Sequence, residues 1–248
     1  MSDVEKSNPI VEQTITGYLH AFGPLVKKED IPRILDPKFS DLVGTIYESN
    51  KDLLQIFFGL PIAALSSDIL ERYVEVTEGY HLPIAPFTPQ IGDRLLKPLK
   101  SAKRNYCLGD FSASIASCGM VGEMLAVLIW KINDVQLKGK TITESEEKGM
   151  FGDTFEKLGQ EKRLRILKTC DFINDNQQRL FIEIKNSRNR YLHSWTIDLT
   201  DEKQVALDAT RKSFQLFKEI TAIGLGDKGT VTMNPLFLKL FKASGDPV

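Results

Sequence analysis

The sequence predicts an all-α fold, a four-helix up-and-down bundle with helical additions. Apolar residues recur at spacings of three and four in most segments between residues 40 and 223. No alternation with a period of two persists over several segments, as half-buried strands would require. The chain has neither an internal repeat nor a low-complexity tract, so a solenoid or a disordered chain is not expected.

The first 88 residues are predicted to form a mostly helical extension. Residues 1–7 are a loose end, and residues 10–35 are interrupted by glycine and proline. From Ser40 the apolar side chains share one helical face, which comprises Leu42, Val43, Ile46 and Tyr47. Asn50 or Asp52 is expected to cap a further run that ends near Pro61. A helix from Ser67 to Glu78 follows, and Gly79 ends it.

Three prolines, Pro83, Pro86 and Pro89, mark the best domain boundary in the chain. Proline has no N–H to donate to a helix, so residues 82–89 should separate two helical regions. We therefore expect a helical extension at residues 1–88, a helical bundle at 89–224, and a C-terminal tail at 225–248 that packs on the bundle.

Inside the bundle, a turn at residues 105–110 leads into the apolar run from Phe111 to Trp130, in which Glu123 is the sole charge. Residues 138–152 are polar, charged and glycine-bearing, so we expect an exposed loop there. A helix is predicted from about Phe155 to Phe172, and Asn174, Asp175 and Asn176 are cap candidates for the next. Thr200 or Asp201 caps the last helix, whose apolar stripe comprises Val205, Ala209, Phe214, Phe217 and Ile220.

The segment Arg188-Asn189-Arg190-Tyr191-Leu192-His193 places a charge within a buried-looking helix. At 3.6 residues per turn, one apolar arc contains Leu180, Phe181, Ile184, Tyr191, Leu192 and Trp195. Arg188 projects from about the middle of this arc, while Asn189 and His193 lie about 100° and 140° away from it. Arginine and histidine can thus converge at the edge of a packing surface. In the alternative reading, the arginine stem covers a seam and the histidine is a cation near a helix C-terminus.

The string Arg188-Asn189-x-x-x-His193, after a helix with an embedded glutamate, resembles the signature of the HEPN superfamily. In that pattern four to six residues separate an arginine from a histidine, and the first of them is polar. The turn and apolar run between Arg104 and Trp130 resemble the first helical hairpin of these proteins. The resemblance covers roughly Pro89 to Ile223 and implies a HEPN-like bundle.

The resemblance also implies a function, a metal-independent endoribonuclease in bacterial defence or a toxin system. His193 would be the general acid or base, Arg188 the phosphate ligand and Asn189 the orienting polar group. HEPN ribonucleases pair two motifs across a dimer, so the implied partners are RNA, a second copy of the chain, and an antitoxin or defence-system protein. No cofactor is expected. The alternative is a catalytically silent HEPN module that binds a nucleotide or a partner protein.

Supporting residues are Glu123, Arg190 and Tyr191. We predict that Glu123 lies within hydrogen-bond reach of Arg188, because each is the lone charge in an apolar stretch; the alternatives are that it faces a loop or the dimer partner. Gly119 and Gly122 permit close helix approach. Basic residues that either follow an RNA backbone or form a solvated helix face are Lys157, Lys162, Arg163, Arg165, Lys168, Lys185 and Arg190.

Composition predicts a cytoplasmic protein with no membrane role. The formal net charge of -1 gives no electrostatic case for general nucleic-acid binding. Residues 1–8 lack the apolar core of a signal peptide, and the most apolar run, residues 53–65, is too short to span a bilayer. The three cysteines, Cys107, Cys118 and Cys170, are expected to be reduced, packed thiols rather than ligands of a zinc site or members of a disulfide framework.

Three further residues are interpreted as follows. His20 and His81 lie among glycine and proline without matched ligands and have no expected role. Some HEPN toxins carry a tyrosine two residues after the histidine, where a partner nucleotidyltransferase modifies it. Trp195 occupies that position here, which argues against this regulation.

Overall fold

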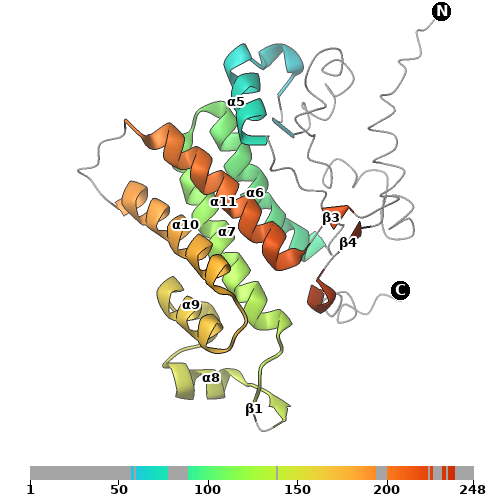
Figure 1. Cartoon of the computed structure of the whole chain (residues 1–248), viewed down its shortest axis with the longest axis vertical. Coiled ribbons are helices and arrows are strands. Elements are labelled where there is room, and N and C mark those ends of the chain that lie inside the picture. The colour runs from blue at the N-terminus through green and yellow to red at the C-terminus, as the bar shows by residue number, and fades with distance from the viewer. Residues whose placement is uncertain are drawn as a thin grey trace, which may run out of the picture.

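The computed structural model describes residues 57–58, 60–77, 89–137, 139–193, 200–222, 224–225, 231–232 and 234–237. Helices dominate this part of the chain (Figure 1). The strands within it form two antiparallel hairpins, β1 (Gln136–Leu137) with β2 (Lys140–Thr141) and β3 (Gly224–Leu225) with β4 (Val231–Thr232). The predicted all-α class is confirmed.

The longer helices of the described region are α5 (Ser67–Thr77), α6 (Pro89–Leu108), α7 (Phe111–Ile132), α8 (Glu144–Phe151), α9 (Gln160–Thr169), α10 (Asp175–His193) and α11 (Glu202–Thr221). Short 3-10 turns are η3 (Ile62–Ala64), η4 (Phe155–Lys157) and η6 (Pro235–Phe237). Helix α5 matches the predicted Ser67–Glu78 within one residue. The helix predicted from Ser40, most of the run before Pro61, and His20 and His81 lie outside the described residues.

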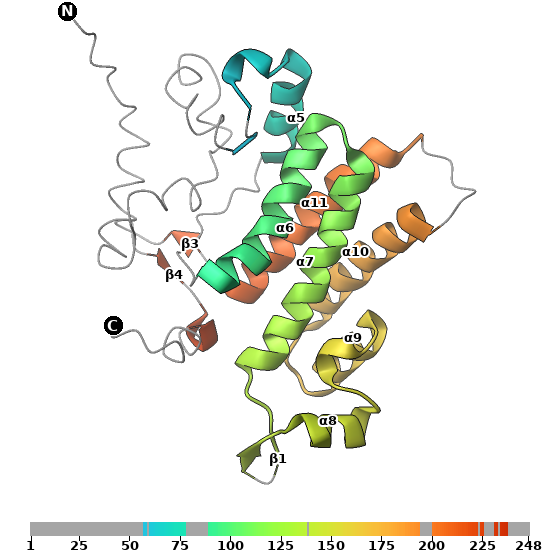
Figure 2. The same ribbon diagram turned by 180° about the vertical axis from the view of Figure 1, so that it is seen from behind.

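Helix α7 is the centre of the fold, because α6, α9, α10 and α11 all pack against it (Figures 1 and 2). Helices α6 and α7 form a hairpin. Gly109, at a φ of 84°, makes the turn, and the Asp110 side chain accepts a hydrogen bond from the Ala113 N–H at 3.0 Å. Helices that follow one another in the bundle alternate in direction. Helices α6 and α10 thus run opposite to α7, whereas α11 runs parallel to it.

The apolar core divides into two clusters along the bundle. The larger one gathers buried side chains from α6, α7, α9, α10 and α11, including Leu125, Phe181 and Phe217. The smaller one joins Tyr73 of α5 to the adjoining ends of α6, α7, α10 and α11. Small polar side chains bring α6, α7 and α11 close together. Ser114 donates to the Ala102 carbonyl oxygen at 2.9 Å and lies 3.0 Å from the Thr210 hydroxyl, so these buried hydroxyls are satisfied.

The segment predicted as an exposed loop at residues 138–152 is exposed as expected, but it holds β2 and α8, so the prediction of a loop is wrong. A capping box starts α8: Thr143 accepts a hydrogen bond from the Glu146 N–H, and the Glu146 carboxylate accepts one from the Thr143 N–H. Gly152 ends the helix with a φ of 86°. Glu147 then joins α8 to the core, since its carboxylate accepts hydrogen bonds from the Trp130 indole and the Phe155 N–H, at 2.7 and 2.8 Å.

The continuous helix predicted from Phe155 to Phe172 is also wrong. It is divided into η4 and α9, with Leu158 and Gly159 in extended conformation between them. Arg163 stabilises this break from the first turns of α9, because its guanidinium donates to the Phe155 and Glu156 carbonyl oxygens at 3.2 and 2.5 Å. Carbonyls that a continuous helix would have satisfied are thus bonded by a side chain.

The sequence predicted caps for the first turns of α10 and α11, and the structure has a side-chain capping bond at α10 but none at α11. Asn174 caps α10 by accepting a hydrogen bond from the Gln177 N–H at 2.8 Å. Asp201 occupies the N-cap position of α11, but its side chain makes no capping bond. At the other end of α11, Asn234 donates to the Thr221 carbonyl oxygen at 2.7 Å and Leu236 packs on the larger cluster, so the described part of the tail contacts the bundle.

Helix α7 is long and apolar enough to cross a membrane by length and composition, and 56% of its most apolar window is buried inside the structure. The central helix of a globular bundle passes the same test. Residues 53–65 were expected to be the most apolar run, but α7 is the longer apolar segment. The absence of a membrane role stays a prediction.

Ala222 ends α11 in the left-handed region, with a φ of 48°. A Cβ in this region costs roughly 1–2 kcal/mol, which glycine avoids. We expect Ala222→Gly to raise the free energy of unfolding by about 1 kcal/mol in urea denaturation. Ala116→Gly, in the second turn of α7, is the control and should lower it by roughly 0.5–1 kcal/mol. A loss of stability in Ala222→Gly would contradict the strain argument.

Candidate functional site

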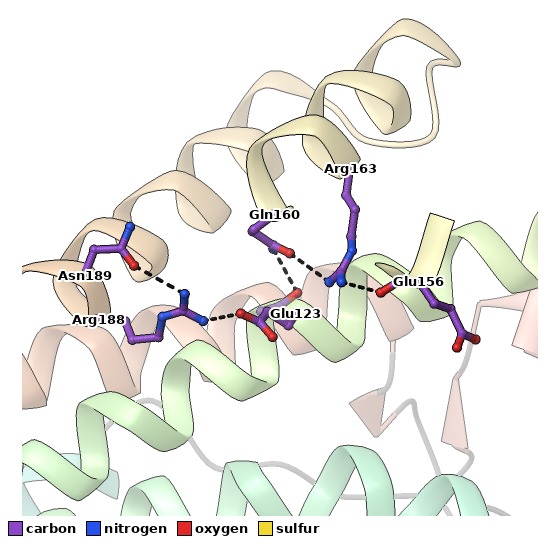
Figure 3. Close-up of polar contacts among 7 residues, drawn as sticks. Glu123, Glu156, Gln160, Arg163, Arg188 and Asn189 are labelled. Atoms are coloured by element: carbon purple, nitrogen blue, oxygen red, sulfur yellow. Dashed lines mark hydrogen bonds and ion pairs between the residues drawn. The ribbon is translucent and has the colours of Figure 1, made fainter. Parts of the chain in front are cut away.

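The candidate site lies where α10 crosses α7, and its centre is an ion pair. The Arg188 guanidinium on α10 donates through Nη1 to Oε1 of Glu123 on α7 (Figure 3). The predicted contact between these residues is confirmed, within one chain. The carboxylate is at the surface rather than in the core, because the Glu123 side chain is 40% exposed and that of Arg188 is 25% exposed. The pair therefore remains accessible from solvent.

Gly119 makes room for this arginine. It lies one turn before Glu123 on α7, and the Arg188 stem passes directly over it. A Cβ added at Gly119 would overlap Cδ of Arg188 and would lie 2.9 Å from Cγ and 3.2 Å from Cβ of that side chain. Real Cβ atoms almost never approach other atoms so closely. The close helix approach predicted for this glycine is confirmed, and its purpose is to let the arginine reach Glu123.

The second arm of the guanidinium lies beside the polar residue of the motif. Nη2 of Arg188 donates to Oδ1 of Asn189 at 3.3 Å, and Asn189 itself is exposed. The Nε of Arg188 is buried and has no hydrogen-bond partner in the described part of the chain. Glu123 and Asn189 thus hold the two terminal nitrogens in a fixed direction, at the edge of the packed surface.

Helix α9 borders the site on its other side (Figure 3). Gln160 donates to the carbonyl oxygen of Gly122, the residue before Glu123, at 3.3 Å. Arg163 donates to the Gln160 side chain at 3.4 Å. Burial lowers the pKa of the Arg163 guanidinium, and the nearby Glu123 carboxylate opposes this shift. Glu123 therefore lies close to two guanidinium groups, those of Arg188 and Arg163.

The last turn of α10 is bound to the start of α11. The Tyr191 hydroxyl donates to Oδ1 of Asp201, and Nη1 of Arg190 lies 3.2 Å from Oδ2 of the same carboxylate. Burial and the hydrogen bond to Asp201 raise the pKa of Tyr191 to about 12, and that hydrogen bond lowers the pKa of Asp201. The phenol is therefore protonated and the carboxylate ionised at neutral pH.

The predicted apolar arc of α10 is largely confirmed. Its buried members are Leu180, Phe181, Ile184 and Tyr191. Leu192 lies on the same arc by angle but is 42% exposed, so it is not part of the core of this chain. It lies one turn after Arg188, near the end of α10, where no described helix covers it. Trp195 and the side chain of His193 lie outside the described residues, so His193 is placed here by its backbone, as the last residue of α10.

The predicted basic cluster is largely paired with acidic groups and carbonyls. Lys185 and Arg165 both lie near Glu161, at 3.6 and 3.7 Å, and Lys168 contacts Asp175 at 2.7 Å. Lys162 donates to the Phe151 carbonyl oxygen. Because these basic side chains are paired, the interpretation of the cluster as a solvated helix face is favoured over a surface that follows an RNA backbone.

The cysteines separate into two kinds. Cys107 and Cys118 are buried thiols, and burial raises the pKa of Cys118 to about 11. Cys170 is exposed, so its expected packing in the core is wrong; it follows the last turn of α9, at the surface. Among the described residues, no group of three or more His, Cys, Asp or Glu side chains could hold a metal ion.

Comparison of the chain with protein families, with curated proteins and with solved structures finds no match. The HEPN resemblance therefore rests on the sequence motif and stays a prediction.

Sequence reasoning missed three residues of the site. Gln160 and Arg163 of α9 lie beside Glu123 because of a helix crossing that no spacing rule reveals. Asp201 was named as an N-cap candidate, yet its carboxylate binds α10. The sequence did contain a signal for the role of Gly119. A glycine one turn before a lone glutamate leaves space on the helix surface for a long side chain that reaches that glutamate.

We expect Gly119→Ala to lower the free energy of unfolding by roughly 1–3 kcal/mol, because the added methyl collides with the Arg188 stem. Gly122→Ala is the matched control. Its Cβ would meet Ile184 and Phe181 at ordinary distances of 3.7 and 3.8 Å, so stability should hold or rise. In urea denaturation, Arg188→Ala should remove most of the Gly119→Ala penalty. If the losses in free energy of unfolding from Gly119→Ala and Arg188→Ala simply add in the double variant, the Arg188 stem is not the reason why position 119 needs glycine.

Proposed function

We propose that this protein is a metal-independent endoribonuclease of HEPN type, with a four-helix up-and-down bundle formed by α6, α7, α10 and α11. One observation carries the proposal: Arg188 is held by Glu123 at the solvent edge of α10, beside Asn189, in the helix that ends at His193. An arginine fixed in direction but still accessible is suited to bind a phosphate.

The proposed reaction is attack by a ribose 2′-oxygen on the adjacent phosphorus. A base removes the 2′-hydroxyl proton as the new O–P bond forms, and an acid protonates the departing 5′-oxygen as its bond to phosphorus breaks. The products are a 2′,3′-cyclic phosphate and a 5′-hydroxyl. Arg188 would stabilise the charge on the phosphorane oxygens. His193 supplies one proton transfer per chain, so His193 of a second copy supplies the other.

The alternative is a catalytically silent module that binds a nucleotide or a partner protein. Two observations favour it. Both terminal nitrogens of Arg188 already have partners within the chain. The basic side chains of α9 and α10 are largely paired with carboxylates, which weakens long-range attraction of RNA. An RNA phosphate would have to compete with Asn189 for Nη2 of Arg188.

We expect a homodimer that forms through α10, because the reaction needs two proton-transfer groups. Leu192 lies about 40° from Arg188 on the helical wheel and is exposed, so it belongs to the predicted interface. Leu192→Glu should convert the dimer to a monomer in light scattering at micromolar concentration. Ile182→Glu is the control, since this exposed residue of α10 faces about 120° away from Arg188. A monomeric wild type would remove the second half of the site.

The purified protein should cleave single-stranded RNA in excess chelator and leave a 2′,3′-cyclic phosphate, detected by mass spectrometry. His193→Ala and Arg188→Ala should each lower the rate about a hundred- to ten-thousandfold, through loss of a proton-transfer group and of the phosphate ligand. Arg179→Ala is the control for a lost arginine, because Arg179 is exposed on α10 and bonds to Asn176.

Two results would contradict the nuclease. The first is a wild type that cleaves none of a varied set of RNAs. The second is a His193→Ala variant that cleaves as fast as the wild type. Either result, together with binding of a nucleotide or a protein, would favour the silent module.

A further inference from the structure

Asp201 stands at the N-cap position of α11 without capping it. An aspartate there ordinarily accepts a hydrogen bond from a backbone N–H in the first turn of its own helix. The Asp201 side chain makes no such bond, and both its oxygens face the last turn of α10. Oδ1 accepts a hydrogen bond from the Tyr191 hydroxyl, and Oδ2 lies 3.2 Å from Nη1 of Arg190. One carboxylate thus binds two consecutive residues of the motif.

These three residues form a compact unit, which we name the α10 clasp: Arg190, Tyr191 and Asp201. The Tyr191 ring is buried in the smaller cluster, together with Ala206 and Leu207 of α11. The Arg190 guanidinium lies 5.3 Å from the centroid of that ring. Packing, a charge-assisted hydrogen bond and a cation–π contact therefore act at the same point on the two helices.

The clasp lies where a helix is least stable. The final turn of an α-helix has unpaired carbonyls and tends to fray, and His193 is the last residue of α10. A group that transfers protons must be held close to its productive geometry, within a fraction of an ångström. Arg190 and Tyr191 precede His193 by three and two residues, so a bond on them restrains the turn that bears the histidine.

We propose that Asp201 is a positioning residue that fixes the end of α10 and thereby sets the place of His193. This inference rests on the proposed function, because it assigns His193 a task that needs exact placement. Stability alone explains the arrangement poorly: the Arg190–Asp201 pair is about half exposed, and exposed pairs contribute little to stability. The raised pKa of Tyr191 and the lowered pKa of Asp201 agree with a charge-assisted bond between them.

The test compares Asp201→Ala, Asp201→Asn and Tyr191→Phe with Asp208→Ala. Asp201→Ala removes both contacts, whereas Asp201→Asn keeps a carbonyl oxygen for the Tyr191 phenol. Tyr191→Phe removes the hydroxyl and keeps the buried ring. Asp208→Ala is the control, because it deletes a carboxylate of α11 that bonds to Gln204 in the same helix. For each variant we would measure kcat and KM on RNA, and the His193 imidazole resonance by NMR. The chain has three histidines, and His193→Ala assigns the signal.

We expect kcat to fall about ten- to a hundredfold in Asp201→Ala, with KM nearly unchanged. Asp201→Asn should recover part of this loss, and Tyr191→Phe should lie between Asp201→Asn and Asp201→Ala. The His193 resonance should shift or broaden in Asp201→Ala and Tyr191→Phe and stay in place in Asp208→Ala. If Asp201→Ala does not fold, Tyr191→Phe decides the question by the same two measurements.

The outcomes separate the positioning role from the nuclease. An active wild type whose Asp201→Ala and Tyr191→Phe variants keep kcat and the His193 resonance overturns the clasp and leaves the nuclease standing. A wild type without cleavage, whose His193 resonance nevertheless moves in both variants, overturns the nuclease and supports the restraint of α10 by Asp201. A resonance that also moves in Asp208→Ala shows a general effect of charge on α11 and overturns the specific role of Asp201.

Discussion

The crossing of α7 and α10 depends on one long side chain that passes from one helix to the other. Arg188 leaves α10 over Gly119, where α7 has no side chain, and ends at Glu123, one turn further along α7. A guanidinium at a helix interface is stable when a carboxylate compensates its charge and its stem is packed. Gly119 therefore lets the two helices approach, and Glu123 determines where the charge lies.

The rest of the bundle obeys the same rule, that a polar group between helices needs a partner from a neighbouring element. The hydroxyls of Ser114 and Thr210 lie 3.0 Å apart between α7 and α11. Lys103 is fully buried, and its ammonium lies 4.3 Å from the centroid of the Tyr73 ring. Glu147 bonds the Trp130 indole while the Trp130 ring stacks on Phe155 at 4.4 Å. These pairings fix which helices meet and at which residues.

Pairing of charges within the chain also shapes what the site can do. Glu123 and Asn189 orient the Arg188 guanidinium and occupy part of its donors, so a ligand phosphate must replace a contact as well as make one. Donors are occupied in the same way on α9, whose lysines and arginines bond mostly to neighbouring carboxylates and carbonyls. A nuclease built on these residues would recognise phosphate at short range, by geometry, rather than by a broad positive surface.

The sequence alone determined the helical class, the bounds of α5 to within one residue, and the hairpin of α6 and α7, because each depends on local signals such as periodicity and caps. It also proposed the pairing of Glu123 with Arg188 from their isolated charges, beside two alternatives, and the structure selected that pairing. The capping box at Thr143 and Glu146 was also a local signal, and a polar, glycine-bearing composition concealed it. The tertiary structure alone decided that the helix predicted from Phe155 is interrupted at Leu158 and Gly159, that Leu192 is exposed, and that Asp201 binds Tyr191 instead of capping α11. These outcomes depend on which helix lies beside which, and side-chain spacing within one helix does not contain that information.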